Sequence, residues 1–153
     1  VKVLTLNTNM VSEIEVQTPN GEITYEGDAT INGAPGSSAP ITINFLDVAG
    51  SVCGSLLPTG NLVDEFTIDG FGTLQATCID NGMPMILVRA EDVQRTAYES
   101  VDQLNQDDEL KDVIEKLRLV ASRKMGLGDV STKNFPKMCL LNRPLHGGGV
   151  HTG

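Results

Sequence analysis

The amino-acid sequence predicts an α+β fold built from antiparallel or mixed sheets, and three observations predict it. Short runs of alternating apolar and polar residues, typical of half-buried strands, recur over residues 1–90. Residues 100–125 instead have apolar side chains at intervals of three and four, the spacing of an amphipathic helix. A further apolar run, 135–141, follows. Strands that precede one long helix and a last strand are typical of the α+β class.

The N-terminal part of the chain predicts an antiparallel meander. Strand-like runs occupy residues 1–8, 12–19, 22–31 and 41–47. Asn20-Gly21 lies between the second and third runs and is a strong hairpin signal, whereas 32–40 (NGAPGSSAP) is a turn-rich loop. We therefore expect residues 1–47 to form a meander with one face in water.

The middle of the chain predicts three more strands. The run over residues 61–93 is interrupted twice, by DGFG at 69–72 and by NGMP at 81–84. The last of its strands, 84–90 (PMILVRA), is apolar on both faces. This pattern predicts a central strand that is covered on both sides.

The helix is expected to begin near Asn105 or Asp107, either of which is a suitable N-cap. Acidic residues follow at its start, where they complement the helix dipole, and basic residues gather at its end. Gly126 is expected to terminate it. These signals predict an amphipathic helix of about four turns.

Charge and composition exclude several function classes. The net charge is −9, and the eleven Lys and Arg residues are scattered, which argues against a nucleic-acid partner. No apolar run approaches the roughly 20 residues that span a bilayer. Three widely spaced cysteines predict free thiols in a reducing, cytoplasmic compartment. The sequence also shows no spacing typical of a metal site, and His146 and His151 are interpreted as solvated loop residues.

Two turns are candidates for ligand contact. Asn81, Gly82 and Met83 form a tight turn between apolar strands, whose backbone N–H groups could bind a carboxylate oxygen. The alternative is an ordinary hairpin turn, beside which Cys78 is a buried structural cysteine. In the unusual stretch GSVCGSLLPTGNLVD, Thr59 and Gly60 form a corner that suits a hinge or a ligand clamp.

Lys137 is the candidate cation because it opens the last apolar strand, 135–141. Facing inward, it would supply positive charge for an anionic substrate in a negatively charged protein. The alternative is a lysine that points to solvent at a strand end.

These motifs together resemble a known family. The segments GSVCGSLLPTGNLVDEFTIDGFGTLQATCIDNGMPMILVRAEDV, RKMGLGDV and FPKMCLLNRPLHGG look like the central part of the PrpF family, which includes methylaconitate isomerases and 4-oxalomesaconate tautomerases. The resemblance implies a diaminopimelate-epimerase-like fold, with mixed or antiparallel sheets around a central helix in each of two half-domains. It implies that residues 1–69 complete the first half-domain, that 70–153 begin the second, and that the loop between them is the crossover.

The resemblance also implies a chemistry. Such proteins catalyse a cofactor-independent 1,3-proton shift on a small unsaturated polycarboxylate, and this chain is most similar to the oxalomesaconate tautomerases. The cleft residues expected on this basis are Thr59, Gly60, Asn81, Gly82, Met83 and Lys137. Where related epimerases have an Asn that binds a carboxylate, this chain has Met83. The usual proton-transfer residues belong to segments outside this sequence, so no catalytic residue is assigned.

Two interpretations therefore stay open. The chain is expected to be either a truncated isomerase or tautomerase with substrate-cleft loops but without the full catalytic set, or a non-catalytic binding or structural module derived from that fold. Half of a two-domain fold exposes a core-facing sheet, so the second interpretation allows self-association into a homo-oligomer.

Overall fold

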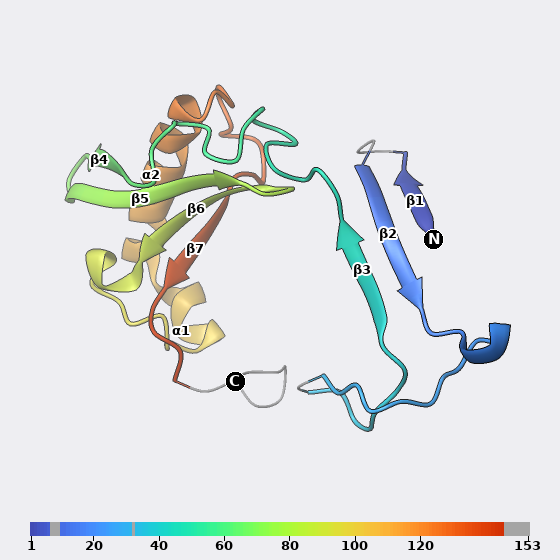
Figure 1. Ribbon diagram of the computed structural model, residues 1–153. Coiled ribbons are helices and arrows are strands. Elements are labelled where there is room, and N and C mark those ends of the chain that lie inside the picture. The colour runs from blue at the N-terminus through green and yellow to red at the C-terminus, as the bar shows by residue number, and fades with distance from the viewer. Residues whose placement is uncertain (7–9, 32, 146–153) are drawn as a thin grey trace. The chain divides into compact units, whose positions relative to one another are not determined.

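The computed structural model describes residues 1–6, 10–31 and 33–145. The described residues form two compact units, one containing Val1–Val48 and residues 143–145, the other containing Ala49–Asn142. The chain is α+β as predicted, with an antiparallel sheet in the first unit and a mixed sheet together with both α-helices in the second (Figure 1). The boundary between residues 48 and 49 separates two compact units and does not test where one half-domain of the fold ends and the next begins. The assignment of 1–69 and 70–153 to two half-domains therefore stays a prediction.

The first unit contains a three-stranded antiparallel sheet in the order β1-β2-β3. Its strands are β1 (Lys2–Thr5), β2 (Met10–Val16) and β3 (Ile41–Phe45). The register places Val3 opposite Ser12 and Ser12 opposite Phe45. The meander is therefore confirmed for these three strands.

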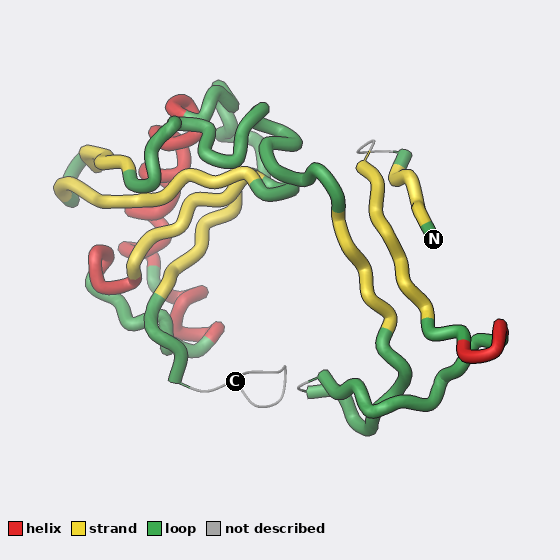
Figure 2. The backbone as a smooth tube through the Cα atoms, in the orientation of Figure 1, coloured by secondary structure: helices red, strands yellow, loops and turns green. Residues whose placement is uncertain are grey.

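The prediction of a strand over residues 22–31 is wrong. Asn20 and Gly21 do adopt left-handed φ values of 56° and 85°, and they follow Pro19 in the single turn η1 (Pro19–Gly21). The chain then runs as a long loop, apart from one bridge between Ala29 and Ser38, and β2 pairs with β3 (Figure 2). Gly27 lies so close to the backbone of Ala39 that a Cβ there would overlap it, so the loop closes on itself at this point.

The expectation that the meander is wet on only one face is also wrong. Because side chains alternate along strands, the register places Val3, Ile14, Ile43 and Phe45 on one face. On that face Ile43 is 50% exposed and Phe45 is 58% exposed. Within the described residues of the first unit, the sheet therefore presents an apolar face that no other element of this unit covers.

The second unit is a four-stranded mixed sheet in the order β4-β5-β6-β7. The strands are β4 (Asp64–Ile68), β5 (Gly72–Asp80), β6 (Pro84–Arg89) and β7 (Lys137–Leu141). Neighbours are antiparallel except β6 and β7, which are parallel. The connection between those two consists of η2 (Ala90–Val93), α1 (Val101–Gln106) and α2 (Asp108–Lys124). The three middle strands and the last strand are confirmed.

Helix α2 lies along one face of this sheet and forms the core with it (Figure 1). Its stripe of Leu110, Val113, Leu117 and Ala121 is buried against the inward side chains of β4, β5 and β6. Strand β6 is central, as expected, but it is not covered on both faces. Its buried residues alternate with half-buried ones, because α2 covers only one side.

The ends of α2 follow its sequence signals closely. Asp107 is the N-cap and accepts a hydrogen bond from the backbone N–H of Leu110 at 2.9 Å, whereas Asn105 lies inside α1 and is not the cap. The separate helix α1, which the pattern did not reveal, begins at a capping box formed by Ser100 and Gln103. Gly126, with φ +77°, follows the end of α2, as predicted.

Arg118 connects α2 to the segment that precedes β7. It is 8% exposed and pairs with both carboxylate oxygens of Glu115 at 2.7 Å. Its other donors reach the backbone oxygens of Val130, Lys133 and Phe135. One guanidinium thus fixes the path of the chain up to the start of β7.

Candidate functional site at one end of the mixed sheet

Most of the predicted site residues lie at one end of the sheet in the second unit. Strand β5 ends at Asp80, the turn Asn81–Met83 follows, and β6 starts at Pro84, which pairs with Asp80. Since β7 is parallel to β6, it also begins at this end, where Lys137 is in register with Met85. The strand order therefore brings the turn and the lysine to the same end of the sheet.

The turn between β5 and β6 is tight. Gly82 has φ +89°, a value that an L side chain rarely adopts. Asn81 is exposed and forms an isolated bridge with Ala49. Met83 is 46% exposed. The turn thus presents both backbone and side-chain groups to solvent, which a small ligand could reach.

The loop that carries Thr59 and Gly60 is bound to the end of β5. The Asp80 carboxylate accepts hydrogen bonds from the backbone N–H groups of Val52 and Cys53, each at 2.7 Å. The backbone of Asp80 adds two more bonds, from Gly50 N–H at 2.7 Å and to Leu56 O at 2.9 Å. The first part of the loop therefore runs beside the Asn81–Met83 turn.

The corner itself is a hydrogen-bonded turn. Gly60 N–H donates to Leu57 O at 2.9 Å, and Gly60 has φ +79°. Thr59 is half-buried, and its hydroxyl accepts a 3.4 Å bond from Asn61 N–H. This arrangement fixes the corner locally and leaves Gly60 exposed.

A buried carboxylate, Asp64, holds the far end of the same loop. It is 2% exposed, and its Oδ1 accepts from Asn61 Nδ2 at 2.8 Å and from Lys124 Nζ at 2.7 Å. Burial alone would raise the pKa of Asp64, but hydrogen bonds from Lys124, Thr59 and Asn61 lower it below the usual value. Asp64 therefore stays ionised in the folded protein near neutral pH.

The thiols near this loop are not activated. Burial, together with the charge of Asp80, raises the pKa of Cys53 to about 11. Burial, together with the charge of Asp64, raises the pKa of Cys78 to about 12. Cys78 is fully buried, as expected of a structural cysteine. Both thiols are protonated near neutral pH, and neither is suited to act as a base there.

Lys137 lies on the sheet face that α2 does not cover. Its neighbour Met138 packs against the core, so the alternation of β7 puts Lys137 and Cys139 on the opposite face. Lys137 is exposed. A shallow hollow of about 300 Å³ lies on the same face farther along the strands, between Thr77, Leu87 and Leu141. The lysine is thus available to an anion that reaches this end of the sheet.

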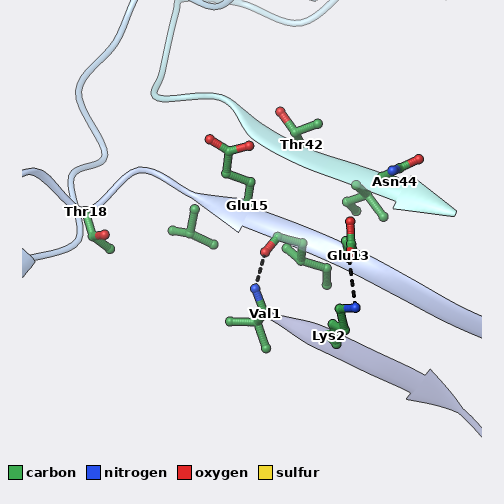
Figure 3. A pocket seen from close by; sticks show the side chains of 10 residues that line it. Val1, Lys2, Glu13, Glu15, Thr18, Thr42 and Asn44 are labelled. Carbon is green, nitrogen blue, oxygen red and sulfur yellow. Dashed lines mark hydrogen bonds and ion pairs between the residues drawn. The ribbon is translucent and has the colours of Figure 1, made fainter. Parts of the chain in front are cut away.

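A second hollow, in the first unit, suits an anion poorly. It lies on the three-stranded sheet, where Lys2 forms an ion pair with Glu13 at 3.2 Å and Glu15 is close by (Figure 3). The N-terminal amine of Val1 donates to Ile14 O (Figure 3). Two carboxylates therefore line this hollow together with Lys2 and the Val1 amine, so it has no excess positive charge to attract a polycarboxylate.

Some residues that support the site, or the strand that leads to it, could not be found by sequence reasoning. Asp64, Asp80 and Arg118 are ordinary polar residues in the sequence, and their only signal was a charged side chain at a position where the strand or helix pattern calls for burial. His146 and His151 lie outside the described residues. Within the part of the chain that is described, no group of three His, Cys, Asp or Glu side chains could hold a metal ion.

Comparison with known proteins identifies the family. The family described as "PrpF protein" matches residues 1–151, so this chain belongs to the PrpF family. It is 45% identical to the 4-oxalomesaconate tautomerase of Pseudomonas putida over 99% of this chain and 41% of that protein. It is 49% identical to the (4E)-oxalomesaconate Delta-isomerase of a Novosphingobium species over 94% of this chain and 39% of that protein.

The fold comparison agrees with this assignment. The crystal structure of a methylitaconate-delta-isomerase matches with a TM-score of 0.74 and 34% identity, over 83% of this chain and 33% of that one. The diaminopimelate-epimerase-like fold implied by the sequence is thereby confirmed. The chain spans about two fifths of the length of the curated relatives it matches. No helix in the described part of the chain is long and apolar enough to cross a bilayer.

Proposed function

We propose that this chain supplies part of the substrate-binding site of an isomerase or tautomerase that acts on a small unsaturated polycarboxylate of the 4-oxalomesaconate type. In the reaction a base removes a proton from carbon next to a carbonyl or carboxylate, the double bond moves, and an acid returns a proton at the other end of the allylic system. The electrons stay within the substrate, so this proton shift needs no cofactor.

One observation carries the proposal: the Asn81–Met83 turn, Lys137 and the anchored loop that bears Thr59 and Gly60 belong to the same end of one sheet. Backbone N–H groups of a tight turn and a lysine ammonium are groups that bind carboxylates. The same donors would stabilise the enolate-like charge that develops during the proton shift. The names of the relatives support the polycarboxylate as substrate.

The groups that transfer protons are proposed to lie outside this sequence. Within the described residues, Cys53 and Cys78 are both held in the protonated form by burial and by a neighbouring carboxylate. This observation also favours the second candidate function, a module that binds the polycarboxylate without turning it over. Both candidates share the binding site and differ only in the chemistry.

Proton NMR in D2O with 4-oxalomesaconate and with methylaconitate tests both candidates. We expect substrate resonances to broaden in the presence of the chain, which reports binding, without deuterium incorporation or movement of the double bond. Deuterium incorporation above the buffer rate would show that a base is present in these residues, and the chain would be an isomerase by itself. Absence of broadening at millimolar ligand would overturn the proposed binding site.

A further inference from the structure

The residue that organises the candidate site is Asp80, which the sequence did not single out. It is the last residue of β5 and faces the core, where the residue is 0% exposed. A carboxylate in such a place must be compensated by hydrogen bonds, because burial of an unpaired charge is very costly. Its Oδ2 is compensated by the N–H groups of Val52 and Cys53, each at 2.7 Å.

The loop is shaped so that these two N–H groups point at the carboxylate. Gly54 N–H donates to Gly50 O at 2.8 Å, which makes residues 50–54 a single helical turn. Gly50 has φ +73°, and a Cβ there would overlap the backbone of Ser55. The N–H groups near the start of such a turn lack partners within it, and Asp is a preferred acceptor for them. Asp80 thus acts as a cap supplied by a distant strand.

The backbone of the same residue completes the connection. Gly50 N–H donates to Asp80 O, and Asp80 N–H donates to Leu56 O. Asn81, the next residue, forms a bridge with Ala49. One residue therefore ties the loop that leads to Thr59 and Gly60 to the turn that contains Asn81.

The second carboxylate oxygen of Asp80 is not compensated in this way. Asp80 Oδ1 is buried and has no hydrogen-bond partner among the described residues. Burial of an oxygen without a partner is unfavourable. If residue 80 served only to fill space, a neutral or apolar side chain would therefore suit this position better than Asp. The charge-assisted bonds to the loop are the compensating gain, since bonds to an ionised acceptor are stronger than neutral ones.

We propose that Asp80 is the positioning residue of the candidate site: its carboxylate holds the 50–60 loop against the Asn81–Met83 turn, so that the two polycarboxylate-binding segments are preorganised. This inference rests on the proposed function. It assigns no contact between Asp80 and the substrate. The carboxylate acts through the loop, and the two N–H groups that it binds partly compensate its negative charge.

The test uses Asp80→Asn, which keeps the shape and one acceptor oxygen but removes the charge, with Asp69→Asn, at an exposed position in the turn between β4 and β5, as the control. Amide hydrogen exchange followed by NMR is compared at Val52 and Cys53 and at Leu74 in the core. We expect exchange at Val52 and Cys53 to accelerate at least tenfold in Asp80→Asn, with Leu74 unchanged. The dissociation constant of trans-aconitate, a stable unsaturated tricarboxylate, should rise about tenfold, whereas Asp69→Asn should change neither quantity.

Several outcomes would overturn the inference, and they are distinguishable from failure of the proposed function. Unchanged exchange at Val52 and Cys53 in folded Asp80→Asn would show that the carboxylate does not hold the loop. Faster exchange with unchanged trans-aconitate affinity would show that the loop does not belong to the binding site. If the wild-type chain binds neither trans-aconitate nor 4-oxalomesaconate, the proposed function fails, and faster exchange alone would still support the anchoring role of Asp80.

A measurement on the wild-type protein covers the case in which the variant does not fold. Hydrogen bonds transmit a small scalar coupling from the amide nitrogen of the donor to the carboxyl carbon of the acceptor. We expect such couplings from Val52 and Cys53 to the Asp80 side chain. Their absence in the folded wild-type protein would overturn the proposal.

Discussion

Lys124 Nζ lies 2.7 Å from Asp64 Oδ1, an ion pair between residues 60 positions apart that joins the end of α2 to the first residue of β4. The carboxylate is buried, whereas the lysine side chain is 44% exposed and its ammonium lies 5.3 Å from the centre of the Phe66 ring. The ion pair thus lies at the boundary of the core, beside the loop that bears Thr59, and links α2 to β4 there.

Removal of this lysine should destabilise the second unit. In Lys124→Met the buried Asp64 carboxylate loses its charged partner but keeps the amide of Asn61, so we expect a loss of about 1–3 kcal/mol in the free energy of unfolding. Urea denaturation of the wild type and the variant measures it. Lys111→Met, which removes an exposed lysine from the other end of α2, is the control and should change stability by less than about 0.5 kcal/mol. Equal effects would contradict the buried pair.

The buried Arg118 guanidinium should contribute more to stability than the exposed basic side chains of α2. Arg118→Met removes the donors for three backbone oxygens and leaves Glu115 unpaired, so we expect a loss of about 2–4 kcal/mol. Arg123→Met, at an exposed position five residues later, should be nearly neutral. Thermal unfolding by circular dichroism compares the two, and a Tm for Arg118→Met equal to that of Arg123→Met would contradict the contacts described.

The N-cap of α2 makes stability depend on pH in acid. Hydrogen bonds from Arg95 and from the Leu110 backbone N–H lower the pKa of Asp107 to about 2. Because the folded pKa lies below the unfolded value of roughly 4, the contribution of Asp107 is complete above that pH and is lost as the pH falls toward 2. We expect the Tm of the wild type to fall more steeply between pH 4 and pH 2 than that of Asp107→Asn.

A neighbouring carboxylate provides the control for this pH dependence. Asp108 has a side chain that is 93% exposed, so Asp108→Asn should keep the steep acid limb of the wild type. If Asp107→Asn and Asp108→Asn show the same dependence, the pH effect does not come from the helix cap.

Lys137 should contribute to binding of a polycarboxylate. We expect Lys137→Ala to weaken trans-aconitate binding roughly tenfold, the loss typical of one charge-assisted contact, with the melting temperature unchanged because the side chain is exposed. Lys111→Ala changes the net charge by the same amount away from this end of the sheet. Isothermal titration calorimetry on both variants separates a local contact from a general effect of charge, and equal affinities would show that Lys137 is an ordinary solvent-facing lysine.

The apolar face of the first sheet should be accessible to hydrophobic probes and should promote self-association. Ile43→Lys places a charge on that face, and Asn44→Lys places the same charge on the other, since neighbours in β3 point to opposite faces. We expect the dye ANS to bind the wild type and Asn44→Lys alike and to bind Ile43→Lys less. Light scattering after size-exclusion chromatography should show a smaller mass for Ile43→Lys if the chain is a homo-oligomer, and equal dye binding by all three proteins would contradict the exposed face.

The sequence by itself determined the α+β class, seven of the eight expected strands and the cap and end of the main helix. These features depend on local alternation, on side chains such as Asp107 that bond to the backbone nearby, and on Gly126, whose conformation other residues rarely adopt. The motifs around Asn81 and Lys137 also carried the family resemblance, which the match over residues 1–151 confirms.

Tertiary structure decided the rest, because pairing and burial depend on residues that are far apart in sequence. Residues 22–31 alternate as a strand does, and the sequence predicts that they pair with β2. The edge of β2 that they would join is occupied by β3, and one edge of a strand accepts only one neighbour. Asp80 and Asp64 look like surface residues until the 50–60 loop and Lys124 fold over them. No local pattern encodes a carboxylate that caps a turn 27 residues away. The contact between Asp80 and the 50–60 loop could therefore be found only in the tertiary structure.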